Sequence, residues 1–444
     1  MASITKYRDK QGPHGESPTK WYLTETSASS FARPIVATRA RDLRSGRPIW
    51  TGRRAPSVSQ LALSKNHKID VLVIGAGLTG AIVADALSSA GVEVAVVDKR
   101  GPARGSTLAS TALVQYEIDT PLIMLTRKIG KRNAVRAWRR SRLAVESLSA
   151  RFGELALTDV VRRNSLYLAG DVLGADDLRR EHQARSAIGL PSRFLDSKSL
   201  QKNFGITRAA ALVGYGNLAI DPRKATLALL SAAVNNGAQI FSNMEMTKVT
   251  PKRGGVVVTA ANDCRIQCAH LVFATGYELP DGVPHGNHKI TSTWAIATAP
   301  QSKERLWPGE CMICEASDPY LYIRTTAEGR VICGGEDEEL SNADERDDLI
   351  ARKTAALKRK LHKLLPKIDT TVEFAWTGAF GETDTGLPII GQVPGMPRCW
   401  IALGYGGNGT TYAAIAAEII VGAIVGRPDV DADIYQFSEH HKVG

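Results

Sequence analysis

The sequence predicts an α/β fold. A discontinuous Rossmann-like dinucleotide-binding domain is expected beside a smaller substrate domain built on an antiparallel sheet. Three observations predict it. A β-α-β pattern with a glycine fingerprint lies at residues 69–98, antiparallel strand patterns lie at 289–340, and a glycine-rich loop opens a helix at 404–411. Parallel-sheet patterns near both ends of the chain, with antiparallel strands between them, indicate that the middle interrupts the first domain.

The glycine fingerprint follows an apolar run, residues 71–74, which is typical of a buried strand. In the Gly-x-Gly-x-x-Gly spacing, Gly75 permits the tight turn, Gly77 lets the backbone approach a pyrophosphate, and Gly80 lets helix and strand pack closely. The following helix offers free N–H groups and a partial positive charge to phosphates. A second strand ends in Asp98, near the spacing of about 20 residues expected of the acid that binds a ribose hydroxyl. The pattern predicts a bound dinucleotide; the alternative is a doubly wound domain with an empty site.

Length and charge narrow the class of protein. The 444 residues have room for two or three domains, and 43% apolar residues suffice for a sizeable core. The formal net charge is +11, but residues 1–68 hold 13 Lys/Arg against 4 Asp/Glu, so the remainder is nearly balanced. This balance argues against nucleic acid as a partner. We expect residues 1–68 to form a basic arm, partly ordered where Trp21, Tyr22 and Trp50 pack on the body.

The cysteines and the first residues indicate the compartment. Six scattered cysteines, and no apolar leader over residues 1–20, favour free thiols in a reducing cytoplasm. Cys311-x-x-Cys314 could be a redox or metal pair, but two small buried residues on one strand are favoured, because no second pair lies at zinc-site spacing. The apolar stretch 412–425 is too short to span a bilayer and contains Glu418, so we expect a core helix and no transmembrane segment. The predicted localisation is cytoplasmic.

A helical pattern covers residues 122–150, and its part at 127–142 carries eight Lys/Arg and no acid. A solvated helix face is one interpretation of this charge. The other is a docking patch for an acidic partner or a membrane surface.

Four stretches together resemble one family, the flavin-dependent amino-acid and amine oxidoreductases that include D-amino acid oxidase, glycine oxidase and sarcosine oxidase. The stretches are 75–98, 105–111, 273–276 and 376–410. Their joint order and spacing are specific, although no single one is, and the resemblance covers about residues 69–440. It implies FAD rather than NAD, and a reaction in which the flavin accepts a hydride from the carbon that bears an amino group.

We expect the chain to be divided into an arm, a discontinuous FAD-binding domain and a substrate domain. The arm is 1–68, the FAD-binding domain is 69–126, 210–288 and 374–440, and the substrate domain is 127–209 and 289–373.

Carried over by position, the resemblance implies FAD contacts along the whole chain. Asp98 would hold the adenosine ribose and Val249 would contact the adenine side. Arg100, Ser106 and Thr111 would line the path of the phosphates and the flavin, and the carboxy-terminal glycine loop would face the flavin ring. The implied residues are Gly75, Gly77, Leu78, Thr79, Gly80, Asp98, Lys99, Arg100, Ser106, Thr111, Val249, Thr275, Gly276, Gly407, Asn408, Gly409 and Thr410.

The sequence departs from the family at two positions. Several members place an arginine two residues after a W-x-G glycine, where this chain has Phe380 after Gly378. A simple glycine-type or D-amino-acid-type pocket is therefore not implied. No cysteine occurs at 377–386, so we expect FAD to be bound non-covalently.

One strand of the predicted substrate domain carries the candidate catalytic residues. Tyr320, Tyr322 and Arg324 share a face of this strand, since side chains alternate along a strand. The planar fork of an arginine matches a carboxylate, so the three side chains suit the carboxylate of an amino acid. The alternative is an exposed strand face with a solvated arginine.

We therefore predict an FAD-dependent oxidoreductase that oxidises the C–N bond of an amino acid or amine, with oxygen or another electron acceptor. Two alternatives remain. One is a dehydrogenase that passes electrons to a quinone or protein partner, and the other is a non-catalytic FAD-binding subunit.

Overall fold

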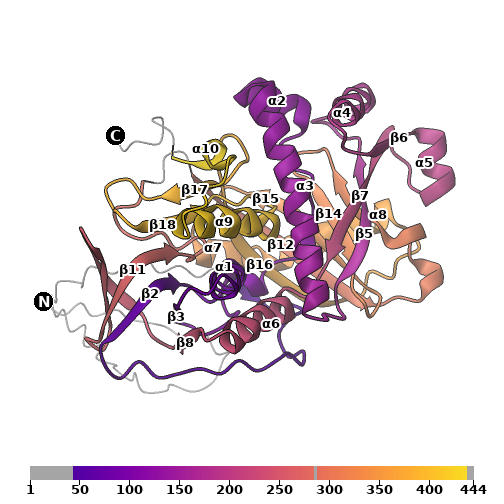
Figure 1. Ribbon diagram of the computed structural model, residues 1–444. Helices are drawn as coiled ribbons and strands as arrows, with labels where there is room; N and C mark the ends of the chain where they lie inside the picture. The colour runs from indigo at the N-terminus through magenta and orange to yellow at the C-terminus, as the bar shows by residue number, and fades with distance from the viewer. Residues whose placement is uncertain (1–43, 285–287, 438–444) are drawn as a thin grey trace, which may run out of the picture. The chain divides into compact units, whose positions relative to one another are not determined.

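The computed structural model describes residues 44–284 and 288–437 (Figure 1). Trp21 and Tyr22, which we expected to pack on the body, lie outside these residues. The described chain is built on two β-sheets, and long helices accompany both. Helices and strands are labelled as in Figure 1.

The first sheet contains the glycine fingerprint and is mainly parallel. Its central strand, β2 (His67–Ile74), is buried on both faces, as expected of a parallel strand between two layers. Val71 and Val73 pack toward helices, whereas Leu72 and Ile74 pack into a second apolar cluster on the other face. In spatial order the strands are β17 (Ile389–Gln392), β18 (Cys399–Leu403), β11 (Arg265–Phe273), β2, β3 (Val94–Asp98) and β8 (Gln239–Ser242), with β10 (Gly255–Ala260) and β9 (Met246–Lys252) extending antiparallel from β11.

The second sheet has ten strands and is mainly antiparallel. By strand number it is the larger sheet, because β1, β4, β7 and most of β16 join it from segments that we had assigned elsewhere. The expected hairpin of residues 320–334 is present, with Arg324 opposite Ile332. In spatial order the strands are β1 (Arg44–Gly46), β16 (Val372–Glu382), β12 (Lys289–Pro300), β15 (Arg330–Glu338), β14 (Leu321–Thr325), β13 (Met312–Glu315), β5 (Val161–Leu168), β7 (Ala210–Ala219) and β4 (Leu113–Val114), with β6 (Ser192–Asp196) beside β7.

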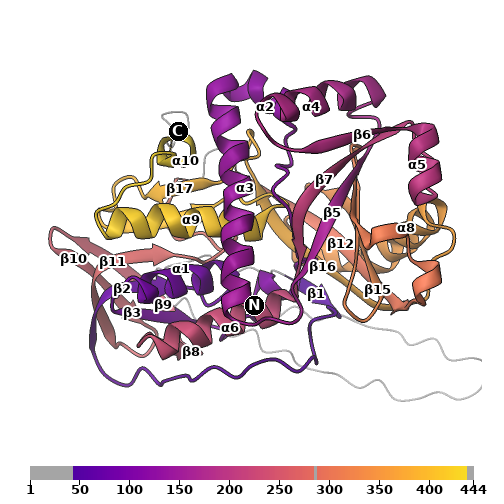
Figure 2. The same cartoon turned by 45° about the vertical axis from the view of Figure 1, so that its right-hand side comes forward.

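Three helices stack on one face of the first sheet (Figure 2). They are α1 (Leu78–Ser89), which follows the fingerprint, α6 (Pro222–Asn235) and α9 (Gly409–Ile424), with α1 between the other two. Helix α9 is buried over most of its length, which confirms the expected core helix. Within the described residues, no helix has the length and apolarity needed to cross a bilayer.

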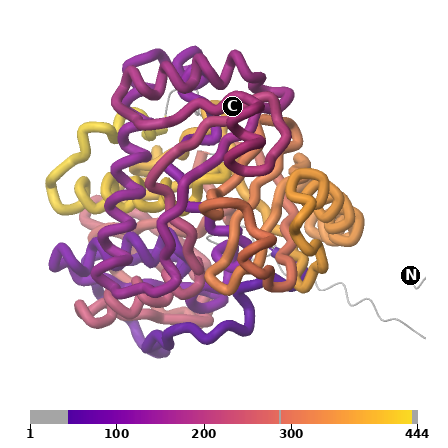
Figure 3. The backbone as a smooth tube through the Cα atoms, turned by 90° about the vertical axis from the view of Figure 1, so that its right-hand side faces the viewer, coloured from indigo at the N-terminus to yellow at the C-terminus, as the bar shows by residue number. Residues whose placement is uncertain are grey.

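The expected helix over residues 122–150 is divided into α2 (Leu122–Ile129) and α3 (Lys131–Glu154). The break falls at Gly130, whose φ of +80° lies in the region that favours glycine. In Figure 3 the yellow carboxy-terminal part of the chain lies beside the purple part that contains α3. The remaining helices are α4 (Ala175–Ala187), α5 (Ser197–Phe204), α7 (Ala343–Asp348), α8 (Ile350–Leu364) and α10 (Ala432–Tyr435).

Most of the arginines of the basic segment 127–142 make contacts within the protein. Arg140 pairs with Glu418 of α9 and with Asp429, and Arg136 pairs with Asp431 and with Asp433 of α10. Arg139 and Arg142 donate to backbone carbonyls. These four side chains therefore support packing of α3, and a docking patch for an acidic partner stays a prediction for the rest of the segment.

Residues 44–63 connect the two sheets. Strand β1 pairs with β16, Trp50 is only 1% exposed, and Leu61 forms a bridge with Phe241 of β8. The expected packing of Trp50 on the body is confirmed, and the described residues before the predicted arm boundary at residue 68 are part of the fold.

The predicted domain boundaries do not coincide with the two sheets. Strands β7 and β16 belong to the second sheet, although their residues were assigned to the FAD-binding domain. The division of the chain into domains stays a prediction.

Candidate functional site

A deep cavity opens where three strands of the first sheet end. Ile74, Asp98 and Ala274, at the carboxyl ends of β2, β3 and β11, lie in its wall. This is the edge at which parallel α/β sheets bind their ligands. The cavity continues to the second sheet, where Tyr320 and Tyr322 line it.

The fingerprint glycines have different local roles. Gly75 has a φ of +115°, and an added Cβ would lie 2.3 Å from the Ala274 carbonyl oxygen. A Cβ at Gly80 would lie 1.8 Å from the Gly75 oxygen, so Gly80 packs α1 against the turn and does not line the cavity. Gly77 precedes α1 and lines the cavity, with only the Thr107 hydroxyl, 3.3 Å away, near its added Cβ. These positions fit the tight turn, the close packing and the open approach that the sequence predicts.

Asp98 joins the fingerprint turn to the loop after β3. One carboxylate oxygen accepts the Ala76 N–H at 2.7 Å. The other accepts the N–H groups of Arg100 at 2.7 Å and Gly101 at 2.8 Å. Burial raises the pKa of Asp98, while these three N–H groups lower it. Asp98 lines the cavity, and its contact with a ribose stays a prediction.

Lys99 and Arg100 line the same part of the cavity, but both are paired with Glu278. Arg100 makes two bonds of 2.7 Å to this carboxylate, and the Lys99 amine lies 3.1 Å from it. Glu278 also lines the cavity and was missed by the sequence analysis. It follows β11 by five residues, and no local pattern links it to Arg100, which lies 178 positions away.

The cavity brings together every predicted cofactor residue except Gly80 and Val249. Val249 does not line the cavity, so its predicted contact with the adenine is not supported by this geometry. This residue lies on β9 opposite Val258 and packs on the apolar core, because β9 leads away from the cavity. Residues 244–246, at the start of the strand, reach the cavity instead.

Arg324 does not reach the cavity, although Tyr320 and Tyr322 do. Its guanidinium is 2% exposed and donates to the carbonyl oxygens of Ala112 and Ile220, each at 2.9 Å. Burial lowers the pKa of this guanidinium. The loop that contains Ala112 lines the cavity and lies between the cavity and the guanidinium. Arg324 is therefore not placed to anchor a substrate carboxylate.

The part of the cavity beside the second sheet, lined by Tyr320 and Tyr322, is here called the chamber. Their ring centroids are 5.7 Å apart, and the Tyr322 hydroxyl lies 3.1 Å from that of Thr293. Burial raises the pKa of both phenols, so they stay protonated at neutral pH. An added Cβ at Gly334 would lie 2.4 Å from the Tyr322 ring, so this glycine makes room for it.

Asp119 organises the carboxy-terminal glycine loop at the chamber. Its carboxylate accepts the Gly407 N–H at 2.7 Å and the Asn408 side-chain amide at 3.2 Å. An added Cβ at Gly406, where φ is +53°, would lie 2.7 Å from the same carboxylate. Asp119 lines the cavity and was also missed by the sequence analysis, because its partners lie almost 290 residues away.

Two further carboxylates lie close to Asp119. Loss of solvation raises the pKa of Asp119 to about 6, and the charges of Glu382 and Asp337 act in the same direction. Burial likewise raises the pKa of Asp337 to about 6, while the hydroxyls of Thr293 and Tyr320 oppose this shift. Burial also raises the pKa of Glu382. These carboxylates give the chamber negative charge, which Lys353 near Asp337 and Lys289 near Glu382 offset in part.

The Cys311-x-x-Cys314 pair behaves as two free thiols. Cys311 is buried, whereas Cys314 lines the cavity with its sulfur 3.5 Å from the Gln115 side-chain oxygen. Burial raises the pKa of both thiols to about 12. In the described part of the chain, no group of three or more His, Cys, Asp or Glu residues is placed to hold a metal ion.

Comparison with known proteins agrees with this geometry. Residues 70–423 match the FAD dependent oxidoreductase family known as DAO. Glycine oxidase of Geobacillus kaustophilus is 22% identical over 397 residues, which cover 85% of this chain and 98% of that protein. Its crystal structure has a TM-score of 0.68 at 18% identity and covers 85% of this chain and 100% of that one, which supports the fold.

Two other relatives are named for different reactions. The tRNA 5-methylaminomethyl-2-thiouridine biosynthesis bifunctional protein of Cupriavidus necator is 24% identical over 426 residues, which are 86% of this chain but only 61% of that protein. Gamma-glutamylputrescine oxidoreductase of Escherichia coli is 21% identical over 370 residues, with coverage of 81% and 84%. Since the family match spans most of the chain and the cavity carries the dinucleotide fingerprint, the chain belongs to the family of FAD-dependent oxidoreductases.

Proposed function

We propose that this FAD-dependent oxidoreductase oxidises the C–N bond of a small amine, and that the substrate enters the chamber as a cation without a carboxylate beside the amino group. The negative charge of the chamber carries this proposal. The residues that hold the cofactor, the charges of the cavity wall and the position of Arg324 each support one part of it.

The cavity fits FAD. The turn at Gly75 and Gly77, with the N-terminus of α1, offers the cradle that a pyrophosphate requires. Asp98 would face the ribose. The flavin would lie between the loop around Thr111 and the glycine loop around Gly407, both of which line the cavity. When bound there, FAD supplies the acceptor for the hydride of the substrate C–H bond.

The charges of the cavity wall favour a cationic substrate. Among the described lining residues, the cations are Lys99 and Arg100, and both are paired with Glu278 beside the first sheet. At the chamber, the charged lining residue is Asp119, and the charge of Asp337 reinforces it. The Asp119 side chain is exposed in the cavity, so its charge would attract an ammonium group and repel a carboxylate at this end.

The position of Arg324 removes the reason for expecting an α-amino-acid substrate. A carboxylate in a cavity requires a cation or several donors to replace its solvation. The guanidinium of Arg324 is behind the loop at Ala112, so it cannot supply this charge. No other described cation lines the chamber. The names of the relatives include both an amino acid and an amine substrate, and the chamber of this chain favours the amine.

The side chains of the chamber have distinct tasks in this proposal. The carboxylate of Asp119 would attract the ammonium group and accept its proton, which leaves the neutral amine that can release a hydride. The charge of Asp337, which does not line the cavity, would reinforce this attraction from behind the wall. Tyr320 and Tyr322 enclose the substrate and exclude water, which strengthens these charge interactions. A fixed amine also holds its C–H bond in one direction, which lowers the entropic part of the barrier.

The test compares substrates that differ by one carboxylate. Purified holoenzyme is mixed anaerobically with putrescine or ornithine, with cadaverine or lysine, and with dimethylamine or sarcosine, and bleaching of the flavin bands is followed. For at least one pair, we expect the amine to reduce the flavin at least ten times more efficiently than its carboxylated partner. Repeating the active pair in air or with a dye then separates an oxidase from a dehydrogenase.

Each result has a distinct meaning. Faster reduction by the carboxylated partners would refute the charge argument and leave C–N oxidation intact. Flavin bands that bleach with none of a broad set of amines and amino acids would contradict the proposed reaction and favour a non-catalytic FAD-binding subunit.

Asp337→Asn tests the role of the charge directly. It removes a negative charge at the chamber and preserves the shape of the side chain. We expect KM for the active amine to rise about tenfold and discrimination against the carboxylated partner to fall. Asp348→Asn, an equal change at an exposed position of α7, is the control and should alter neither value. Equal kinetics for both variants would reject a role of Asp337 in substrate binding.

A further inference from the structure

We infer that residues 44–63, here called the N-terminal strap, form part of the flavin site, and that Trp50 is a positioning residue for it. The strap precedes residues 70–423, which match the family. The strap contacts the loop of residues 109–112, which lines the cavity, and it does not line the cavity itself.

Three carbonyl oxygens of this loop are held by side chains from distant parts of the chain. The Trp376 indole of β16 donates to Ala109 at 2.8 Å, and Arg324 of β14 donates to Ala112 at 2.9 Å. Between them, the indole N–H of Trp50 donates to the Ser110 oxygen at 2.7 Å. The strap therefore supplies the central one of three supports of the loop.

The bond from Trp50 fixes the direction of one peptide plane. In a trans peptide, the carbonyl of one residue and the N–H of the next point in opposite directions. Since the Ser110 oxygen points toward Trp50, the Thr111 N–H points away from the indole, and Thr111 itself lines the cavity. Trp50 thus aims a backbone donor at the region that the flavin would occupy.

Trp50 is itself firmly held. Its ring is 1% exposed, and the guanidinium carbons of Arg53 and Arg324 lie 5.1 Å and 5.3 Å from its centroid. Such cation–π contacts are strongest when water is excluded. The indole has little freedom to turn away from Ser110.

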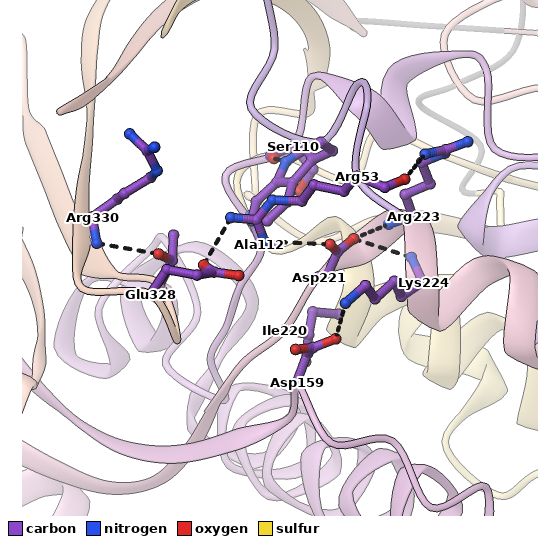
Figure 4. A network of polar contacts seen from close by, with 12 residues as sticks. Arg53, Ser110, Ala112, Asp159, Ile220, Asp221, Arg223, Lys224, Glu328 and Arg330 are labelled. Carbon is purple, nitrogen blue, oxygen red and sulfur yellow. Dashed lines mark hydrogen bonds and ion pairs between the residues drawn. The ribbon is translucent and has the colours of Figure 1, made fainter. Parts of the chain in front are cut away.

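Arg53 connects the strap to the β14–β15 turn and to the start of α6, as Figure 4 shows. Its guanidinium lies 2.8 Å from Glu328 in the turn between β14 and β15, and 3.6 Å from Asp221 at the start of α6. Asp221 also caps α6 by accepting two backbone N–H groups at 3.0 Å. The backbone oxygen of Arg53 accepts a bond of 2.8 Å from Arg223. This network fixes the strap at the position where Trp50 meets the loop.

Trp50→Phe tests the inference, because it keeps an aromatic ring and removes the N–H donor. The apoprotein is titrated with FAD, and quenching of flavin fluorescence gives the dissociation constant. We expect the constant to rise fivefold or more, and the visible bands of bound FAD to shift relative to the wild type. These two readouts report on the flavin site and do not depend on turnover.

Trp307→Phe is a matched control for loss of stability. The indole of Trp307 is 4% exposed and donates to the Cys311 oxygen at 2.8 Å, but it does not line the cavity. Both variants lose one buried indole bond, so both should unfold at lower urea concentration than the wild type. Only Trp50→Phe should change FAD affinity and the flavin bands. Unchanged affinity and bands in Trp50→Phe, with a loss of stability equal to that of Trp307→Phe, would overturn the inference.

Arg53→Gln provides a second test if Trp50→Phe does not fold. It removes the ion pairs that fix the strap and leaves the Ser110 carbonyl and its indole partner in place. We expect the FAD dissociation constant to rise at least twofold. An unchanged dissociation constant and an unchanged flavin spectrum in a folded Arg53→Gln protein would reject the strap as part of the flavin site.

Discussion

Gly77→Ala and Gly80→Ala should separate cofactor binding from folding, although the two glycines belong to the same fingerprint. At Gly80, the added Cβ would lie 1.8 Å from the Gly75 oxygen and 2.9 Å from its carbonyl carbon. An ordinary contact requires more than 3 Å, so α1 would have to move by more than 1 Å while α6 and α9 pack on both of its sides. Overpacking of this kind costs about 1–3 kcal/mol and occasionally more, and backbone atoms cannot turn aside. We expect Gly80→Ala to lower the free energy of unfolding by about 3 kcal/mol or more.

At Gly77 the same methyl group meets a different environment. The φ of −77° is accessible to any residue, and only the flexible Thr107 side chain lies near the added Cβ. Alanine is a poorer N-cap than glycine, which lowers the free energy of unfolding by roughly 0.5–1 kcal/mol. Alanine also reduces the conformational entropy of the unfolded chain, which raises the free energy of unfolding by about the same amount. The stability of the apoprotein should therefore change by less than about 1 kcal/mol. Since the methyl group enters the cavity where a pyrophosphate would approach the backbone, we expect FAD affinity to fall tenfold or more, which corresponds to about 1.4 kcal/mol.

Two measurements on each variant decide the matter. Urea unfolding of the apoprotein, followed by far-ultraviolet circular dichroism, gives the stability, and titration with FAD gives the affinity. A Gly80→Ala protein as stable as the wild type would refute the packing argument. Wild-type FAD affinity in Gly77→Ala would place the pyrophosphate elsewhere.

Three further predictions concern the chamber and the cofactor. Arg324→Gln should lower the stability of the apoprotein in urea by about 3–5 kcal/mol, because the buried carbonyls of Ala112 and Ile220 lose charged donors; normal stability, with a KM raised only for carboxylated substrates, would restore its role as an anchor. The pKa values of Asp119 and Asp337 are raised to about 6, so both carboxylates become ionised as the pH rises through that value. KM for the amine should therefore fall between pH 5 and pH 7, and a flat profile would contradict the assignment of these charges. Acid precipitation should release the flavin into the supernatant, since no cysteine occurs at 377–386, and flavin retained on the precipitate would contradict non-covalent binding.

The elements that the sequence predicted well are those whose information is local. The fingerprint, α1 and β3 lie within thirty consecutive residues, and glycine spacing and apolar periodicity specify them without distant partners. The hairpin of β14 and β15 and the buried helix α9 are specified in the same way. For this reason, the fold class could be predicted from the chain alone. Nearly all the residues proposed to hold the cofactor line one cavity, and their contacts with FAD stay a prediction.

The substrate end of the cavity was decided by contacts between distant residues. Strand alternation predicted that Arg324 shares a face with Tyr322. Its guanidinium instead donates a hydrogen bond to the carbonyl of Ala112, 212 positions away. The sheet to which a strand belongs was also decided by distant residues, because β1 pairs with β16, more than three hundred positions away.

The sequence by itself therefore determined that this protein holds a dinucleotide in an α/β fold, because short-range spacing encodes a turn, a helix and a strand. Only the tertiary structure decided which charges line the cavity and that Trp50 holds the Ser110 carbonyl of a loop in its wall. The direction and partners of a buried side chain depend on which distant backbone groups need a hydrogen bond in the folded state. The spacing of residues along the sequence does not reveal these groups.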